Sequence, residues 1–220
     1  MKRFIVIVAG GKGLRMGSEI PKQFLLFKGK PVLIRTMESF YSFDSSAEII
    51  VVLPQSQIEY WRELCEKYGN TIPHKIVEGG KERFNSVQNG INSIKENGIV
   101  AVHDGVRPIV SKQMLERGFT MAEQYGCAVP FVDSVDSLRV IDGDTTEVLN
   151  RSIVKRIQTP QIFDVKKLQK VMNAEYRPEF TDEATVWELS GSKLYFYEGD
   201  FRNIKITTPE DLRIAEMFVE

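Results

Sequence analysis

Residues 4–17 read FIVIVAGGKGLRMG, an apolar run followed at once by a loop rich in glycine. The run over Phe4–Val8 is β-branched and unbroken, which predicts a strand buried on both faces. The loop after it has four glycines in eight positions, together with Lys12 and Arg15. Glycine lets a ligand approach the backbone closely, and the free N–H groups of such a turn bind anions. With Lys22 shortly after it, the loop predicts a phosphate-binding site.

The spacing of these glycines excludes two common nucleotide-binding motifs. A dinucleotide-binding GxGxxG would need glycine at position 16, where Met16 stands. The P-loop pattern GxxxxGK[ST] begins at none of the glycines. The phosphate ligand therefore has to be identified from the rest of the chain.

Apolar β-branched runs alternate with amphipathic segments up to about residue 132. Strands are expected over 48–53, 74–77, 99–102 and 127–132, and helices over 56–68, 82–95 and 111–125. This alternation predicts a Rossmann-like α/β fold, with a mainly parallel, twisted sheet and helices on both faces. Ligands of such sheets lie beyond the carboxyl ends of the strands. We therefore expect one crevice formed by three loops, at 9–23, 79–86 and 103–108.

A hairpin interrupts the alternation. Ser137–Ile141 and Glu147–Asn150 flank an Asp142-Gly143-Asp144 turn. Two strands are marginally stable alone, so we expect this β-arm, at about 134–156, to pair with its twin in a symmetric homodimer. The alternative is a hairpin folded back on its own domain. In either case the chain is expected to form one domain over 1–220.

The last quarter of the chain returns to helices and short strands. A helix is expected near 164–174, and a strand over 193–198. Thr181 is expected to cap a further helix whose first turn holds Asp182 and Glu183. Residues 203–207 have the alternation of a strand, and Thr208 is expected to begin the final helix.

Composition points to an ordinary enzyme of the cytoplasm. A net charge of −1 gives no reason to expect nucleic-acid or membrane binding. No apolar run approaches the roughly 20 residues that span a bilayer, and the N-terminus lacks the pattern of a signal peptide. Cys65 and Cys127 have no CxxC spacing and are expected to be reduced structural thiols.

Several spaced motifs resemble those of one enzyme family. Ala9-Gly10-Gly11-x-Gly13-x-Arg15-Met16 with Pro21-Lys22-Gln23 is similar to the signature of sugar- and polyol-phosphate nucleotidyltransferases. Among these the chain most resembles the 2-C-methyl-D-erythritol 4-phosphate cytidylyltransferases. The resemblance extends over nearly the whole chain through Gly79-Gly80-x-x-Arg83-x-x-Ser86-Val87, His103-Asp104-x-x-Arg107-Pro108, Thr159-Pro160-Gln161, Thr181-Asp182-Glu183 and Asn203-Ile204-Lys205-Ile206-Thr207.

The resemblance implies a reaction and a set of roles. CTP and a polyol phosphate would be the substrates, Mg²⁺ the metal and pyrophosphate the leaving group, in non-mevalonate isoprenoid synthesis. The implied catalytic residues are Arg15, Lys22, Arg151 and Lys205. Those implied for CTP are Ala9, Gly10, Gly11, Gly13, Gly80, Ser86, Asp104 and Gly105. Those implied for the acceptor are Arg107, Ser134, Arg151, Thr159, Thr181 and Lys205.

The resemblance also implies how the metal and the arm contribute. Mg²⁺ would be held mainly by the CTP phosphates, with Asp104 as the protein ligand. Ser134 and Arg151 lie on or beside the hairpin and would reach the site of the partner subunit. The alternatives to these functional roles are that Arg151 is a solvated charge of the hairpin and that Lys205 faces outward. We expect His103 to be structural, and Trp61 and Trp187 to lie in the core.

The sequence leaves two other functions open. Ribitol-5-phosphate cytidylyltransferases share the Ala9-Gly10-Gly11 form of the loop and would carry out the same reaction for cell-wall polymers. A non-catalytic nucleotide-binding module would need to lack the cations, yet Arg15, Lys22, Arg151 and Lys205 are all present.

Overall fold

The first apolar run forms the central strand of the sheet. The computed structural model describes residues 1–11 and 20–219. In it β1 (Arg3–Val8) pairs in parallel with β4 (Glu48–Leu53) on one side and with β6 (Ile99–Asp104) on the other. The strand β5 (His74–Glu78) extends the parallel sheet beyond β4. Four parallel strands therefore end along one edge of the sheet.

The other half of the sheet is mixed. The strand β11 (Gln161–Asp164) runs antiparallel between β6 and β7 (Cys127–Asp133), while β10 (Lys155–Ile157) and β12 (Phe196–Glu198) pair with β7. Gln161 of β11 lies opposite Val102 of β6. An antiparallel strand thus brings its first residues, rather than its last, to the edge where β6 ends.

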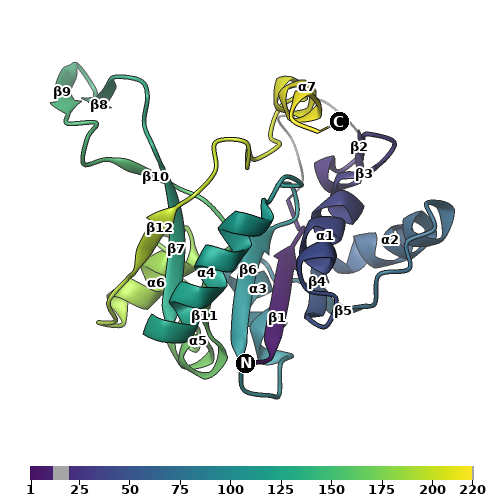
Figure 1. The fold of residues 1–220 in the computed structure, drawn as a ribbon. Helices are drawn as coiled ribbons and strands as arrows, with labels where there is room; N and C mark the ends of the chain where they lie inside the picture. The colour runs from purple at the N-terminus through teal and green to yellow at the C-terminus, as the bar shows by residue number, and fades with distance from the viewer. Residues whose placement is uncertain (12–19, 220) are drawn as a thin grey trace.

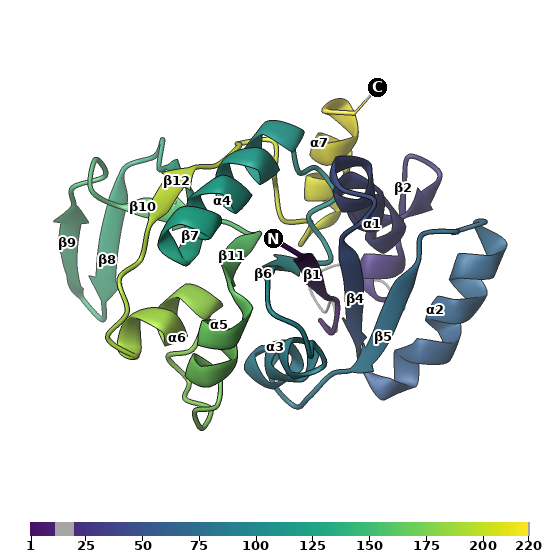
Figure 2. The same cartoon turned by 60° about the horizontal axis from the view of Figure 1, so that its bottom comes forward.

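Helices cover both faces of the sheet (Figure 1, Figure 2). One face is covered by α1 (Val32–Phe43), α2 (Gln55–Lys67) and α4 (Lys112–Tyr125), which form a core with Ile5 and Ile7 of β1. The other face is covered by α3 (Arg83–Asn92), α5 (Val165–Val171) and α6 (Glu183–Leu189), which form a core with Phe4, Val6 and Val8 of β1. The predicted fold class is confirmed.

A third, smaller core lies beyond the carboxyl edge of the sheet. It joins Phe27, Val106, Ile206 and the final helix α7 (Pro209–Met217). Phe27 belongs to a short hairpin of β2 (Leu26–Phe27) and β3 (Lys30–Pro31), which follows the 3-10 turn η2 (Lys22–Phe24). This core fixes the loops that surround the site.

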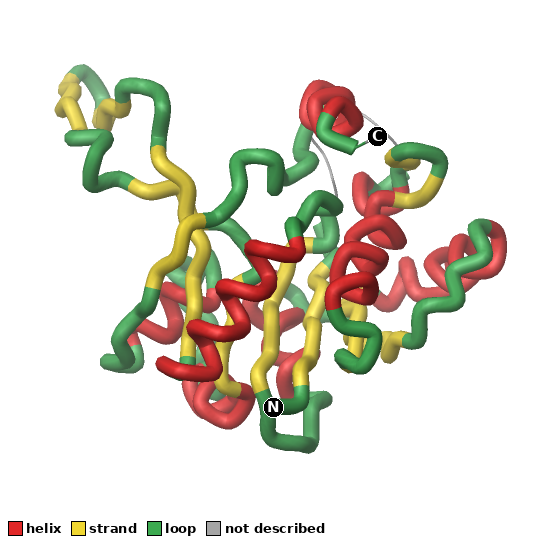
Figure 3. Tube along the Cα trace, in the orientation of Figure 1, coloured by secondary structure: helices red, strands yellow, loops and turns green. Residues whose placement is uncertain are grey.

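The hairpin stands away from the body of the molecule (Figure 1, Figure 3). Its strands β8 (Leu138–Asp142) and β9 (Thr145–Leu149) form a two-stranded sheet of their own. Val140, Ile141 and Val148 are 46%, 73% and 62% exposed. The alternative of a hairpin folded back on its own domain is therefore wrong. Because β10 begins at Lys155, the last residues of the expected arm lie in the main sheet.

Two predictions of local structure are wrong. The N-cap of α6 is Asp182, whose Oδ1 accepts from the Thr185 N–H at 2.9 Å, so Thr181 lies before the helix rather than capping it. Residues 203–207 are not a strand. Ile206 is buried in the third core and donates its N–H to the Val106 carbonyl at 2.9 Å. The apolar and polar residues of this segment therefore alternate as in a strand, although the segment is a loop.

Other features agree with the sequence. Cys65 and Cys127 are free thiols, and burial raises the pKa of both. Trp61 and Trp187 are buried in the cores, as predicted. Among the helices of the described residues, none has the length and apolar character needed to cross a bilayer.

Candidate active site

A cavity of about 230 Å³ lies beyond the carboxyl ends of the parallel strands. The three loops expected to converge there do so within the described residues. Of the predicted nucleotide and catalytic residues, the cavity is lined by Ala9, Gly10, Gly11, Lys22, Gly80, Ser86, Asp104 and Lys205. Gly13 and Arg15 lie outside the described residues.

A second cavity, of about 180 Å³, adjoins the first. It is lined by the predicted acceptor residues Arg107, Thr159, Thr181 and Lys205. Three side chains line both cavities, namely Arg83, Asp104 and Lys205. The boundary between the two spaces is therefore made of two cations and a carboxylate.

The loop before α3 requires glycine at one position. A Cβ on Gly80 would lie 2.3 Å from the Asn85 Cβ, which no larger residue tolerates. The Gly80 N–H donates to the Ser86 Oγ at 3.1 Å, and that hydroxyl donates to the Glu82 carbonyl at 3.1 Å. The loop is thus folded onto the amino end of α3 beside the first cavity.

Gly105 occupies a different position from the other predicted nucleotide residues. A Cβ there would lie 2.9 Å from the Ala9 Cβ, and its N–H donates to the Val8 carbonyl at 2.9 Å. Gly105 is not among the residues that line either cavity. Its contacts account for glycine by close packing against the end of β1.

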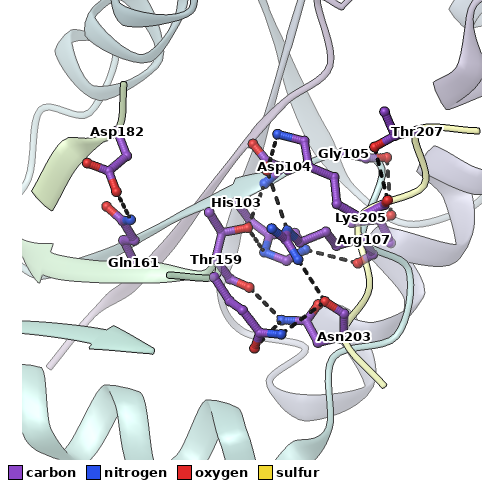
Figure 4. A network of polar contacts seen from close by, with 12 residues as sticks. His103, Asp104, Gly105, Arg107, Thr159, Gln161, Asp182, Asn203, Lys205 and Thr207 are labelled. Atoms are coloured by element: carbon purple, nitrogen blue, oxygen red, sulfur yellow. Dashed lines mark hydrogen bonds and ion pairs between the residues drawn. The ribbon is translucent and has the colours of Figure 1, made fainter. Parts of the chain in front are cut away.

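Asp104 is the electrostatic centre of the site (Figure 4). Its Oδ1 lies 3.4 Å from the Arg83 Nε, and its Oδ2 lies 3.4 Å from the Arg107 Nε and 3.0 Å from the Lys205 Nζ. Burial alone would raise the pKa of this carboxyl, but Arg83, Lys205 and Arg107 outweigh burial and hold it well below its usual range. Asp104 is therefore ionised at neutral pH.

His103 supports this centre from behind. The Arg107 carbonyl accepts from the His103 Nε2 at 3.0 Å, so the proton of the neutral ring is on Nε2. The Thr159 hydroxyl then donates to Nδ1 at 3.0 Å and accepts from the Asp104 N–H at 3.1 Å. Burial lowers the pKa of His103 to about 4. Both nitrogens are occupied, so the prediction of a structural histidine is confirmed.

Asn203 connects the acceptor wall to the last loop (Figure 4). Its Nδ2 donates to the Thr159 backbone carbonyl at 2.7 Å, and the backbone carbonyl of Asn203 accepts from the Arg107 Nη1 at 2.7 Å. Together with the Ile206 contact to Val106, these bonds hold Lys205 beside Asp104. Lys205 therefore faces the site, and the alternative of an outward-facing lysine is wrong.

Sequence reasoning assigned no role to one charged pair of the site. Nη1 and Nη2 of Arg83 donate to Oε1 and Oε2 of Glu183 at 2.6 and 3.2 Å. Burial acts against the charge of Arg83, but Glu183 and Asp104 outweigh it and raise the pKa of the guanidinium. Both residues stand inside the quoted motifs, but nothing in their spacing indicated that they meet.

Two predicted residues lie away from these cavities. Ser134 follows β7 at the base of the arm, and the Arg151 Nη1 donates to the Val135 carbonyl at 2.7 Å. Neither side chain lines the cavity that holds the other predicted acceptor residues. Ser134 and Arg151 therefore do not reach the acceptor cavity of their own chain.

The chain was compared with known proteins. Residues 4–220 match the family model described as 2-C-methyl-D-erythritol 4-phosphate cytidylyltransferase. Curated relatives of that name include one from Phocaeicola vulgatus, 48% identical over 219 residues and 100% of both chains, and one from Clostridium perfringens, 42% identical over 98% of this chain and 97% of its own.

A solved structure agrees with these relatives. The 4-diphosphocytidyl-2C-methyl-D-erythritol synthase of Anaerococcus prevotii is 27% identical, with a TM-score of 0.83 over 99% of this chain and 96% of its own. The match in fold and the match in sequence both extend over almost the full length. The chain belongs to the 2-C-methyl-D-erythritol 4-phosphate cytidylyltransferase family.

Proposed function

We propose that this protein transfers a cytidylyl group from CTP to 2-C-methyl-D-erythritol 4-phosphate and releases pyrophosphate, a step of non-mevalonate isoprenoid synthesis. Family membership supports the reaction. The observation that carries it is the pair of adjoining cavities that share Arg83, Asp104 and Lys205. Two anionic substrates must meet at one phosphorus atom, and a cationic boundary between two spaces suits that requirement.

The reaction needs charge neutralisation more than acid–base catalysis. An oxygen of the acceptor phosphate forms a bond to the α-phosphorus of CTP, while the bond from that phosphorus to pyrophosphate breaks and its electrons leave with pyrophosphate. A phosphate monoester has a second pKa of about 6 and is already ionised near neutral pH. No general base is then required, in keeping with a neutral His103 that is fully engaged in hydrogen bonds.

The first cavity suits the triphosphate and nucleoside of CTP. Backbone N–H groups at Gly10 and Gly11 would hold phosphate oxygens beside the Lys22 ammonium. Gly80 and Ser86 would lie near the base and ribose, with Asp104 on the ribose side. Arg15 and Gly13 complete this proposed set by resemblance.

The second cavity suits the acceptor. Arg107, Thr159 and Thr181 would bind the polyol phosphate. Lys205 is 43% exposed at the boundary while it contacts Asp104, so its ammonium can also contact a phosphate oxygen from that position as the substrates arrive. Lys22 and Lys205 would then stabilise the transferring phosphorus from two sides.

Mg²⁺ would be bound mainly by the triphosphate. The described residues include no cluster of His, Cys, Asp and Glu side chains that could hold a metal ion. Asp104 is a poor ligand because both of its oxygens already face cations. The metal would supply further neutralisation of phosphate charge, and we assign it no protein ligand.

The β-arm would pair with the arm of a second subunit. Its exposed Val140, Ile141 and Val148 are apolar side chains on a sheet too small to be stable alone. In a symmetric dimer, Ser134 and Arg151 would enter the partner's acceptor cavity, which would account for their distance from the acceptor cavity of their own chain.

Pyrophosphate release tests the choice of acceptor. We expect turnover with CTP and 2-C-methyl-D-erythritol 4-phosphate, with kcat/KM at least about 10-fold above that for ribitol 5-phosphate. Turnover only with ribitol 5-phosphate would contradict the proposal, and silence with both acceptors would favour a non-catalytic nucleotide-binding module.

Mixing two inactive variants tests the arm. Lys22→Ala and Arg151→Ala are each expected to be nearly inactive alone. If Arg151 acts across the dimer, a mixed dimer has one site with both defects and one intact site. Random exchange then restores about one quarter of wild-type activity. Subunit exchange, followed by sedimentation of differently tagged chains, is the control, and exchange without recovery would place Arg151 outside the partner's site.

A further inference from the structure

Arg83 lies at the boundary of the two cavities and has no place in the roles proposed above. It lines both spaces, with Asp104 and Lys205. Its donors, however, face carboxylates rather than an open ligand position. Arg83 is therefore placed to orient these carboxylates rather than to bind a substrate directly.

The guanidinium holds two carboxylates at once. Its Nη atoms form a bidentate pair with Glu183 at 2.6 and 3.2 Å, and its Nε faces the Asp104 Oδ1 at 3.4 Å. A planar fork of this kind fixes direction as well as distance. Because Oδ1 faces Arg83, the other oxygen of Asp104 is left to Arg107 and Lys205.

Glu183 is the buried end of this chain of contacts. Its side chain is 2% exposed, and among the described residues it pairs with Arg83. Burial raises the pKa of Glu183, while Arg83 acts to lower it. A buried ion pair is weak evidence for stability, because desolvation consumes most of its attraction. Its placement at a boundary between substrates suggests a further reason for it.

The pair also connects the two halves of the site. Arg83 is the first residue of α3, directly after the loop with Gly80. Glu183 is the first residue of α6, and Thr181 and Asp182 just before it line the acceptor cavity. One ion pair, 100 residues apart in sequence, therefore joins the nucleotide side to the acceptor side.

We infer that Arg83 and Glu183 are positioning residues that orient Asp104, and through it Lys205, so that the two bound substrates meet in line. The inference rests on the proposed function. Neutralising Glu183 frees the Arg83 guanidinium to turn fully toward Asp104, where it competes with Lys205. The groups around the triphosphate, Gly10, Gly11 and Lys22, are unaffected.

Glu183→Gln is the main test. We expect kcat at saturation with both substrates to fall about 30-fold, since displacements near 1 Å cost up to about 100-fold in rate. KM for CTP should change less than about 3-fold, because the groups that hold CTP remain. Arg83→Lys should have a similar effect, and the double variant should lose little more than either single one, as expected of two residues that act as a unit.

The control breaks an ion pair at the opposite edge of the sheet. Arg3 Nη1 lies 3.2 Å from the Asp44 Oδ2 there, so Asp44→Asn should lower Tm without changing kcat. If Glu183→Gln behaves in the same way, with kcat within twofold of wild type, the pair is merely structural and the inference is overturned. Should Glu183→Gln fail to fold, Glu183→Asp keeps the charge and withdraws it by one methylene, with the same expected loss of kcat.

A crystal structure of the variant separates this inference from the proposed function. In Glu183→Gln we expect Lys205 to leave the Asp104 Oδ2, from 3.0 Å in the native chain to a separation beyond an ion pair. An unchanged contact overturns the inference even if the enzyme is active. Absence of wild-type turnover would overturn the proposed function alone, and the position of Lys205 would still decide the role of Arg83 and Glu183.

Discussion

Replacing Lys22 by alanine is expected to lower kcat by about 10³-fold and to leave the fold intact. The loss is large because Lys22 would neutralise charge that develops as pyrophosphate leaves, and single cationic groups in phosphoryl transfer contribute factors of this size. Its side chain is placed for this role, because the Lys22 Cε lies 3.6 Å from the position of a Cβ on Gly11.

The fold should survive because the residues after Lys22 anchor this turn. The Gln23 side chain is fully buried and donates to the Ala9 carbonyl at 2.7 Å and to the Gln57 Oε1 at 2.8 Å. Phe24 stacks on Trp61 with ring centroids 6.1 Å apart. These contacts hold η2 in place without the lysine.

Steady-state pyrophosphate release and thermal melting measure the two parts of this prediction. Lys67→Ala, at the exposed end of α2, is the matched control and should retain full activity. A Lys22→Ala enzyme with kcat within tenfold of wild type would remove Lys22 from the mechanism.

Asp104→Asn is expected to cost about 3–5 kcal/mol of unfolding free energy, the usual cost of removing one member of a buried ion cluster. The carboxylate is 9% exposed and neutralises Arg83, Arg107 and Lys205 together. An amide of the same shape leaves three cations facing one another. Activity should fall as well, because Lys205 loses its anchor.

Urea denaturation of a surface pair provides the comparison. Asp133 pairs with Lys155 and is 64% exposed, so Asp133→Asn should cost less than about 1 kcal/mol. A loss below about 1 kcal/mol for Asp104→Asn as well would mean that other groups neutralise the three cations.

The fold could be predicted largely from unbroken apolar runs. The strand expected over 48–53 is the observed β4, and those expected near residues 4 and 99 are β1 and β6. The helix α1 was not predicted. It follows Pro31 without a side-chain cap, and it begins with three consecutive apolar residues, which do not show the spacing of a helix. The strand β11 was not predicted, because its four residues are too few for a clear hydrophobic pattern. It forms through its pairing with β6 on one side and β7 on the other.

The position of the site was predictable from the motifs, because the residues that they contain line the two cavities. Three motifs far apart in the chain do meet, since Asp104, which pairs with Arg107 of its own motif, contacts Thr159 of a second motif and Lys205 of a third. The link from Arg83 to Glu183 was not predictable, because an ion pair across 100 residues leaves no periodic signal. The prediction of Thr181 as the N-cap of α6 was wrong by one residue: threonine and aspartate both suit that position, and the structure has Asp182 there.

The antiparallel direction of β11 has a mechanical consequence. The chain leaves the arm after β9 and enters β10, whose last residue, Ile157, lines the acceptor cavity together with Gln158 and Thr159, before β11 begins. Arm and wall are thus one continuous piece of backbone, anchored where Thr159 contacts His103. Because the backbone is continuous from the arm to this wall, we expect contacts that fix the arm also to fix the position of the acceptor.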